Sequence, residues 1–415
     1  MPTRRVVVTG VGAVSALGHD APSLWAAHCA GRSGIRPLEE AGPLGLRYSA
    51  AARVADWVPE AHFGPSQLLL LDRFAQFAVV AAREALAGAG LARTEAAGAR
   101  TALVIGSGSG GEGTREVASQ ALFRDGHTRV HPFLVPRSMP SAAASQVSMD
   151  LGVTGPVLTV STACATGTHA IGLASWFVRA GVADRAIAGA SEAPFTVGVL
   201  RAWDALRVVS PDGCRPFACD RRGMILGEGA GMLVLETLEG ALARGATPLA
   251  EVVGFGMSAD AHHITQPSVD GPLQAMREAL ADAGLPADAI GHVNAHGTGT
   301  PTNDATEARA LHALLGARAR RVAVTATKSI TGHPVGAAGA LEAVVTALTL
   351  AHGVVPPTAG VGPLDPSCDL DVVVGAPRSL DAEYALSNSF AFGGLNAVLA
   401  LRRLAPSAGT VAARA

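Results

Sequence analysis

Two stretches of this sequence, one in each half of the chain, show the same order of features. In each, a short run of β-branched and aliphatic residues leads through a polar turn into a segment of small residues. Cys164 in the first turn corresponds to Lys328 in the second, and His169 in the first segment corresponds to His333 in the second. Such self-similarity predicts a fold built from two related halves. Chance matching in a chain rich in Ala, Gly and Val is the alternative explanation.

A second repeat joins residues 8–12 to residues 252–256 and places the break between the halves near Leu249. We therefore expect a first half at residues 1–249, a second half at residues 250–404 and a flexible tail at residues 405–415.

Short strand-like runs alternate with Ala-rich helical stretches along the whole chain. Between these runs, segments such as residues 72–89 place Phe74, Phe77 and Ala81 on one helical face. This alternation predicts an α/β fold with buried sheets. The runs lie at residues 5–9, 101–105, 157–160, 186–188, 250–253, 292–295, 322–325 and 370–374.

The composition limits the classes of function. Of the 415 residues, 49% are hydrophobic and only 16% charged, which favours an oligomer with a subunit interface. A formal net charge of -2 without clustered basic residues argues against binding to nucleic acid or an anionic membrane. The apolar stretch at residues 335–350 contains Glu342, so we expect a helix buried in protein and no membrane span.

The five cysteines show neither a CxxC pair nor zinc-ligand spacing. We therefore expect no metal site and a reducing cytoplasm. The N-terminus also lacks the apolar core and cleavage site of a signal peptide.

Cys164 is the strongest candidate for a nucleophile. It directly follows a predicted strand and precedes a segment that favours a helix. A thiol at that junction faces unpaired N–H groups and the positive end of the helix dipole, which we expect to lower its pKa and to supply donors for an oxyanion. A small buried core cysteine is the alternative, and it is our expectation for Cys29 and Cys368.

Two histidines lie in loops rich in Gly and Thr, each after a predicted strand. His296 stands in NAHGTGTP and His333 in TKSITGH, whose lysine, Lys328, has Glu342 as a candidate partner. Two such histidines indicate a site, whereas a lone histidine is more often structural.

Other glycine-rich loops do not fit a nucleotide site. Ser15 replaces the third glycine of a dinucleotide fingerprint, and residues 105–113 have no Lys-Ser/Thr pair for a phosphate. Near the C-terminus, NSFAFGGLN at residues 388–396 predicts either a plain turn between strands or a gate over a pocket.

Taken together, these segments resemble the β-ketoacyl-acyl carrier protein synthases of the elongating Cys-His-His type over residues 5–401. The motifs VVVTGVGAVSALG, VSTACATGTHAIG, GEGAGMLVLE, NAHGTGTPTND, TKSITGHPVGAAGALE and NSFAFGGLNA occur in family order. Further stretches, such as MPSAAASQVSMDLG and SADAHHITQP, look closest to nodulation-type and polyene-forming polyketide ketosynthases.

The resemblance implies a thiolase-like fold of two duplicated α/β halves in five αβαβα layers. It also implies an enzyme that is a homodimer, or a heterodimer with a chain-length-factor-like subunit. The reaction would be the decarboxylative condensation of malonyl-acyl carrier protein with an acyl group on Cys164. No cofactor is implied, because the phosphopantetheine arm arrives on the carrier protein.

The resemblance also assigns roles to individual residues. The backbone N–H groups of Cys164 and Phe392 would form the oxyanion hole, with Phe392 as a gate, while His296 and His333 would bind the malonyl thioester and stabilise its enolate. Lys328 would act on His333 and its surroundings, with Glu342 as its counter-charge. The implied supporting carboxylates are Asp304 and Glu307, and the implied substrate-binding residues are Thr265, Thr298, Thr300, Ser109, Phe133 and Phe390.

The chain departs from the family at two places. Ser109 stands where fatty-acid members have a bulky aliphatic residue, which favours a longer, unsaturated or oxygenated primer. The segment at residues 66–72 is apolar where many members show basic residues that contact the carrier, so docking would use other arginines, such as Arg73, Arg201 or Arg207, or a dedicated carrier. Alternatively, its leucines face a partner subunit or simply pack inside the start of a helix.

Three rival functions fit less well. A thiolase normally uses a second cysteine where this chain has His333, and a chain-length partner typically lacks the nucleophile that Cys164 provides. A cysteine hydrolase would not need two histidine loops and a gate.

Overall fold

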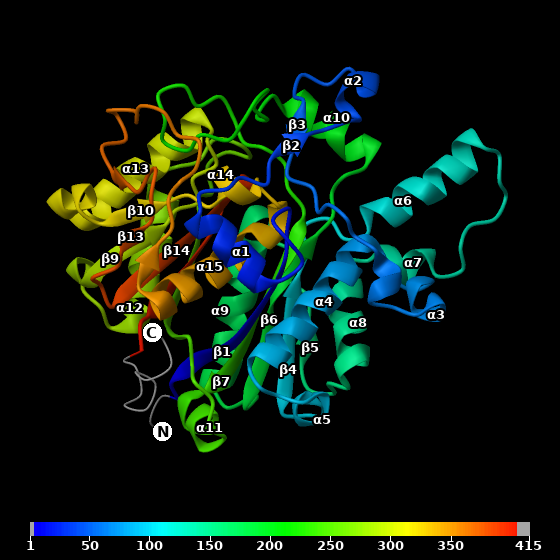
Figure 1. Cartoon of the computed structure of the whole chain (residues 1–415), viewed down its shortest axis with the longest axis horizontal. Coiled ribbons are helices and arrows are strands. Elements are labelled where there is room, and N and C mark those ends of the chain that lie inside the picture. Colours follow the sequence, from blue (N-terminus) through cyan, green and yellow to red (C-terminus); the bar gives the residue numbers. More distant parts are fainter. Residues whose placement is uncertain (1–3, 405–415) are drawn as a thin grey trace.

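The structure is a computed structural model and describes residues 4–404. The tail expected at residues 405–415 lies outside the described residues. The fold is built on an eleven-stranded sheet in the order β12-β10-β9-β14-β15-β8-β1-β7-β6-β4-β5 (Figure 1).

Each half of the chain contributes its own part of this sheet. The strands of the first half are β1 (Val6–Val14), β4 (Thr101–Gly106), β5 (Val157–Leu158), β6 (Arg185–Glu192) and β7 (Gly229–Thr237). Those of the second half are β8 (Ala250–Ala259), β9 (Ile290–Asn294), β10 (Ala323–Thr325), β12 (Asp371–Val372), β14 (Tyr384–Ala391) and β15 (Leu395–Arg402). Every predicted strand-like run therefore coincides with a strand.

The two halves repeat one strand order. With the edge strand β12 left out and the other strands numbered within their own half, each set reads third, second, fourth, fifth, first: β5-β4-β6-β7-β1 and β10-β9-β14-β15-β8. In both sets the second strand pairs in parallel with the third and the fourth, and the remaining pairs are antiparallel. The sequence repeats fall on equivalent strands, β5 with β10 and β1 with β8, so the predicted duplication is confirmed.

The halves are joined through β1 and β8. Val6, Val7 and Val8 pair with Val252, Glu251 and Ala250 in antiparallel register. The two β layers are therefore two parts of one continuous sheet that meet along these few residues.

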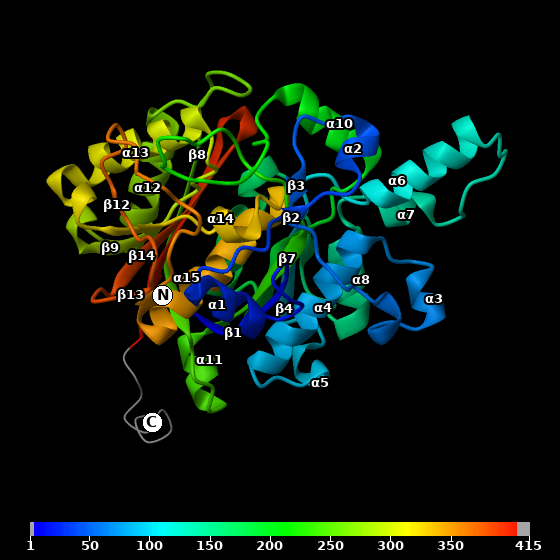
Figure 2. The same cartoon turned by 45° about the horizontal axis from the view of Figure 1, so that its top comes forward.

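Helices form three layers around the strands, which gives the predicted five-layer arrangement. The outer helices α4 (Arg73–Gly88) and α8 (Ala142–Leu151) cover the first half. The outer helices α12 (Asp270–Ala283) and α13 (Pro301–Leu315) cover the second half. Between the halves lie α9 (Thr166–Arg179) and α15 (Ala338–His352), together with α1 (Ala21–Cys29) (Figures 1 and 2).

Small residues allow the central helices to pack closely. A Cβ at Gly167 of α9 would lie only 2.5 Å from the backbone N of Ala340 in α15, and one at Gly172 would lie within 2.3 Å of the Phe255 ring. The Ala- and Gly-rich segments read from the sequence are thus the parts of α9 and α15 that must approach other backbone.

The long apolar stretch seen in the sequence forms a 3₁₀ turn followed by the helix α15. Residues 335–352 are long and apolar enough to cross a membrane by length and composition, but 83% of this window is buried inside the protein. The expected buried helix is therefore confirmed.

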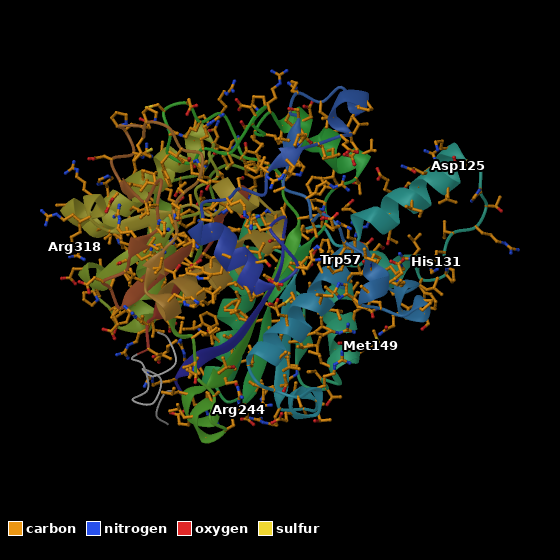
Figure 3. The ribbon with its side chains drawn as sticks, viewed as in Figure 1. Trp57, Asp125, His131, Met149, Arg244 and Arg318 are labelled. Carbon is orange, nitrogen blue, oxygen red and sulfur yellow. The ribbon has the colours of Figure 1, made fainter. Side chains whose placement is uncertain are left out.

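A projecting arm extends from the first half. It contains α6 (Glu112–Ser119), a π-helical turn (Gln120–Arg124) and α7 (Leu134–Ser138), with Asp125 at its outer end and His131 where the chain returns toward α7 (Figures 1, 2 and 3). Phe123 on this arm is 87% exposed. The remaining short elements are α2 (Ala41–Leu44), α3 (Pro65–Leu68), α5 (Arg93–Ala96), α10 (Val197–Leu206), α11 (Leu238–Ala243), α14 (Lys328–Thr331), β2 (Arg36–Pro37), β3 (Ala50–Ala51), β11 (Val354–Val355) and β13 (Arg378–Ser379).

Candidate active site

Cys164 lies in a tight turn at the start of α9. The preceding residue, Ala163, has a φ of 49°, in the left-handed region that an alanine rarely adopts. The Thr166 hydroxyl accepts a hydrogen bond from the backbone N–H of Thr162 at 2.8 Å and so closes the turn. The strained turn sets the thiol at the end of the helix, as the sequence predicts.

The expectation of a lowered pKa for this thiol is wrong. Burial raises the pKa of Cys164 to about 11, and the nearby carboxylates of Glu192 and Glu342 act in the same direction. The charge of Lys328 and a hydrogen bond from the backbone N–H of Phe392 oppose this shift but do not cancel it. The prediction considered the favourable effect of the helix end, but the sequence does not show how deeply the thiol is buried, and burial disfavours the charged form. The resting group is therefore a neutral thiol.

The loop that carries His296 is held by a buried carboxylate. Glu307 on α13 accepts hydrogen bonds from the backbone N–H of His296 at 2.9 Å and of Gly297 at 2.8 Å. Asp304, one turn earlier, accepts from Gly299 at 3.2 Å and from Phe217 at 2.9 Å. The two predicted supporting carboxylates therefore hold the loop from behind.

Lys328 fixes the protonation of His296. Its ammonium group lies 3.2 Å from Nδ1 of His296 and 2.7 Å from the carbonyl oxygen of the same residue, and it also pairs with Glu342. An ammonium only donates, so Nδ1 of His296 accepts and its proton must reside on Nε2. Burial and the charge of Lys328 lower the pKa of His296 well below its ordinary value, which keeps the ring neutral. The sequence assigned this lysine mainly to His333, whereas its direct contact is with His296.

His333 follows α14 and faces His296. The two ring centroids are 5.6 Å apart and nearly perpendicular, at 86°. The backbone N–H of His333 donates to the carbonyl oxygen of Ile225 at 2.6 Å, which fixes this segment against the first half. Burial and Lys328 lower the pKa of His333 well below its ordinary value, so this ring is neutral too.

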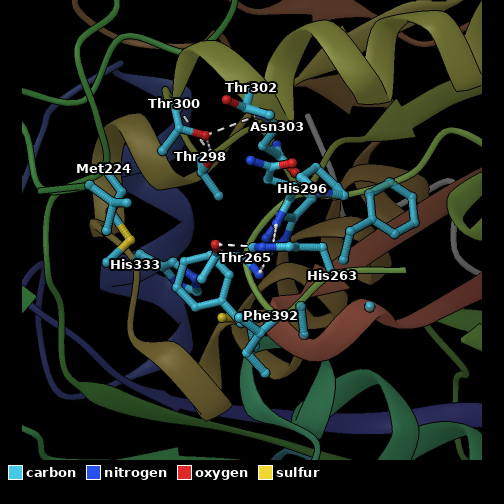
Figure 4. A pocket seen from close by; sticks show the side chains of 18 of the residues that line it. Met224, His263, Thr265, His296, Thr298, Thr300, Thr302, Asn303, His333 and Phe392 are labelled. Atoms are coloured by element: carbon cyan, nitrogen blue, oxygen red, sulfur yellow. Dashed lines mark hydrogen bonds between the residues drawn. The ribbon is translucent and has the colours of Figure 1, made fainter. Parts of the chain in front are cut away.

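One cavity brings the predicted groups together (Figure 4). Cys164, His296 and His333 all line it. Five predicted substrate or gate residues also line it: Thr265, Thr298, Thr300, Phe390 and Phe392. The hydroxyls of Thr298 and Thr300 lie 2.9 Å apart and form a hydrogen-bonded pair.

The segment NSFAFGGLN forms a turn that borders the cavity, and the role of Phe392 as a gate stays a prediction. Residues 392–394 form the turn between β14 and β15, and Phe392 also lines the cavity. Its ring stacks on Trp203 of α10, with centroids 6.1 Å apart at 27°.

Two predicted substrate-binding residues do not line this cavity. Ser109 donates its hydroxyl hydrogen bond to Glu192 at 2.7 Å, on the loop after β4. Phe133 lies on the projecting arm and is 44% exposed. Within this single chain neither touches the cavity around Cys164.

Several residues of the site were missed by sequence reasoning. Trp203, Met224 and His263 line the cavity, and Glu192 lies buried beside Cys164. An isolated glutamate at a strand end, or a lone tryptophan in a helix, carries no spacing signal that would reveal it. Of the two cysteines expected in the core, Cys368 is buried but Cys29 is only partly so.

Comparison with known proteins identifies the family. Residues 3–241 match the family "Beta-ketoacyl synthase, N-terminal domain", and residues 249–362 match "Beta-ketoacyl synthase, C-terminal domain". "Nodulation protein E" of Rhizobium sp. (strain N33) is 47% identical over 401 residues, covering 97% of this chain and 100% of that protein.

Two further relatives agree in fold and sequence. "3-oxoacyl-[acyl-carrier-protein] synthase 2" of Staphylococcus aureus (strain COL) is 42% identical over 407 residues, covering 96% of this chain and 98% of that protein. The solved structure "The ishigamide ketosynthase/chain length factor" superposes with a TM-score of 0.92 at 37% identity, covering 97% of this chain and 100% of that one. The predicted thiolase-like ketosynthase fold is thereby confirmed, and the chain belongs to the β-ketoacyl synthase family.

Proposed function

We propose that this ketosynthase joins an acyl group held on Cys164 to a malonyl group delivered by an acyl carrier protein. The observation that supports this most directly is that Cys164, His296 and His333 share one cavity in which burial keeps both imidazoles neutral. An enolate is a developing anion, and hydrogen-bond donors in a dry pocket stabilise it without first having to lose a charge.

The first step transfers the acyl group. The Cys164 sulfur attacks the carbonyl carbon of the acyl thioester, and the proton of the thiol passes to the departing carrier thiol. The backbone N–H of Phe392, which points to this sulfur, is one donor for the transient oxyanion, and the N–H of Cys164 is the other.

The second step forms the carbon–carbon bond. The malonyl carboxylate leaves as carbon dioxide, and the electron pair of the broken bond forms a thioester enolate. The Nε2–H of His296, fixed by Lys328, and the imidazole of His333 hold the enolate oxygen. The enolate carbon attacks the acyl carbonyl, and Cys164 departs as a thiolate that takes up one proton, leaving a β-ketoacyl carrier.

The partner follows from the same chemistry. The S. aureus relative carries the acyl carrier protein in its name, and we propose such a carrier for this chain. Arg73 is not free for docking, because it pairs with the buried Glu228 at 2.8 Å. Arg201 and Arg207 are exposed on α10 and just after it, beside the cavity residue Trp203, and remain as docking candidates.

Assembly and location are proposed from the surface and from the cysteines. Three exposed apolar side chains favour a dimer: Val157 on the edge strand β5, Met149 on α8, which packs against β5, and Val135 on α7, which packs against α8. The partner would be a second copy or a chain-length-factor-like subunit, as in the name of the ishigamide structure. All five cysteines are free, which supports a reducing cytoplasm, and we propose that the reaction needs no cofactor or metal of its own.

Mass spectrometry of the intact protein tests this function. Incubation with acyl carriers of different chain lengths should add one acyl mass to Cys164, and later addition of malonyl carrier should remove that mass with release of carbon dioxide. A protein that loads no acyl group, or that returns it by hydrolysis without forming a longer product, would contradict the proposal.

A further inference from the structure

Glu192 is a buried carboxylate beside the nucleophile to which the reaction described above gives no task. It ends β6 and is fully removed from solvent. No arginine or lysine neutralises it among the contacts of the described residues, and all of its hydrogen-bond donors are uncharged. A buried carboxylate without a cation is costly, so its bonds must be well satisfied to keep it in place.

Its two oxygens bind two segments that are far apart in the sequence. Oε1 accepts from the hydroxyl of Ser107 at 3.0 Å and from the hydroxyl and N–H of Ser109 at 2.7 Å and 3.1 Å. Oε2 accepts from the N–H of Gly108 at 2.7 Å and from the N–H of Gly336 at 3.1 Å. One oxygen atom thus joins the loop after β4 to the segment that follows His333.

The space around Oε2 of Glu192 is too small for a side chain at either neighbouring glycine. A Cβ at Gly336 would lie 2.5 Å from Oε2 and 2.6 Å from the backbone N of Gly108, and one at Gly108 would lie 2.8 Å from Oε2. Val335, between His333 and Gly336, has a φ of 42°, which an unstrained valine does not adopt. The position of this segment is therefore imposed by its contacts.

We propose that Glu192 is a positioning residue of the condensation step, which holds the His333 segment against the 107–109 loop at the distance from Cys164 that the enolate requires. This inference rests on the proposed function. The carboxylate touches no reacting atom; it acts through the backbone of Gly336 and through its charge, which also disfavours the thiolate of Cys164.

The variant Glu192→Gln tests this role, because an amide nitrogen, which cannot accept a hydrogen bond, replaces one of the two oxygens, and each oxygen accepts from at least one backbone N–H group. Two half-reactions are measured on the full chain. The rate of acyl transfer from a carrier to Cys164, followed by intact mass spectrometry, should stay within about 3-fold of wild type. The N–H groups proposed to bind the oxyanion of this step belong to Cys164 and Phe392, which Glu192 does not hold. Condensation of the preloaded enzyme with malonyl carrier should fall about 100-fold, the cost of a misplaced catalytic group.

A second readout follows the charge. Alkylation of Cys164 by iodoacetamide across a pH series should shift to lower pH in Glu192→Gln, because a negative charge near the sulfur has been removed. A residue that only stabilised the fold would not move this profile. Ser107→Ala keeps the carboxylate but removes one of its hydrogen-bond donors. It should also slow condensation more than loading, with a smaller loss of rate, and it replaces Glu192→Gln if that variant does not fold.

Glu236→Gln is the matched control. Glu236 is also buried, but it lies on β7 and binds Thr9 and Arg244. Its substitution should lower stability without changing the ratio of the two half-reactions. If Glu192→Gln slows loading and condensation equally, or slows neither, the positioning role is wrong. If the wild-type enzyme itself forms no condensation product, the proposed function fails instead.

Discussion

Lys328 and Glu342 form an ion pair with side-chain exposures of only 1% and 2%. Burial raises the pKa of Glu342 to about 7, although the charge of Lys328 opposes this shift. Neither partner has another group of opposite charge at hydrogen-bonding distance within residues 4–404, so each depends on the other.

Replacing the lysine alone should therefore be severe. Lys328→Met leaves a carboxylate buried without its cation, and we expect a loss of about 3–5 kcal/mol in the free energy of unfolding. The double variant Lys328→Met, Glu342→Leu should regain most of this stability in urea unfolding. It should remain inactive in condensation, because Nδ1 of His296 has lost its donor. Recovery of activity together with stability would show that the lysine is only structural.

Removal of the nucleophile should separate the two chemical steps. Cys164→Ala should load no acyl group in intact mass spectrometry, because no other cysteine lines the cavity. It should still release carbon dioxide slowly from malonyl carrier, since His296 and His333 are intact. Carbon–carbon bond formation by this variant would contradict the account of the site.

Ser109 does not line the cavity around Cys164 in this single chain, so its effect on the choice of primer stays a prediction. Ser109→Ile introduces the bulk that the family resemblance implies at this position and removes the hydroxyl bond to Glu192. We expect loading to shift toward shorter saturated chains, measured by competing acyl carriers of several lengths. An unchanged profile, together with a wild-type preference for medium saturated chains, would refute the hypothesis of a longer or oxygenated primer.

The stability of the chain should fall between pH 6.5 and pH 4, in part because of His28. Burial lowers the pKa of His28 from 6.5 to about 4, and its Nδ1–H donates to the carbonyl oxygen of Leu24 at 2.8 Å. The folded state therefore binds fewer protons than the unfolded state in this window, and acid favours unfolding. Between pH 7.5 and pH 5, wild type should lose about 2 kcal/mol more than His28→Leu in urea unfolding. Parallel pH profiles would show that His28 is not buried as described.

Much of the fold was predictable because the repeats fall on matching strands. Local patterns reveal a strand, a turn and a helix of small residues, and the equivalence of Cys164 and Lys328 follows from their place in each half. The division at residue 249 into two parts stays a prediction as a domain boundary, since β1 and β8 pair across it.

The pKa values and charge contacts of the site could not be predicted from the sequence. The pKa of the Cys164 thiol is raised by burial and by the carboxylates of Glu192 and Glu342, which come from distant parts of the chain. The contact of Lys328 with His296 likewise depends on how two loops of the second half face each other. A sequence pattern shows which groups are present, and only packing shows which of them meet.

The short register between Val6–Val8 and the start of β8 also bears on truncation. A fragment that ended at Leu249 would leave the valine edge of β1 without its neighbour, and a fragment that began at Ala250 would expose the facing edge of β8. Open apolar strand edges recruit other chains, so each fragment expressed alone should aggregate. When the two fragments are refolded together, they should instead associate through β1 and β8 and stay in solution as a complex.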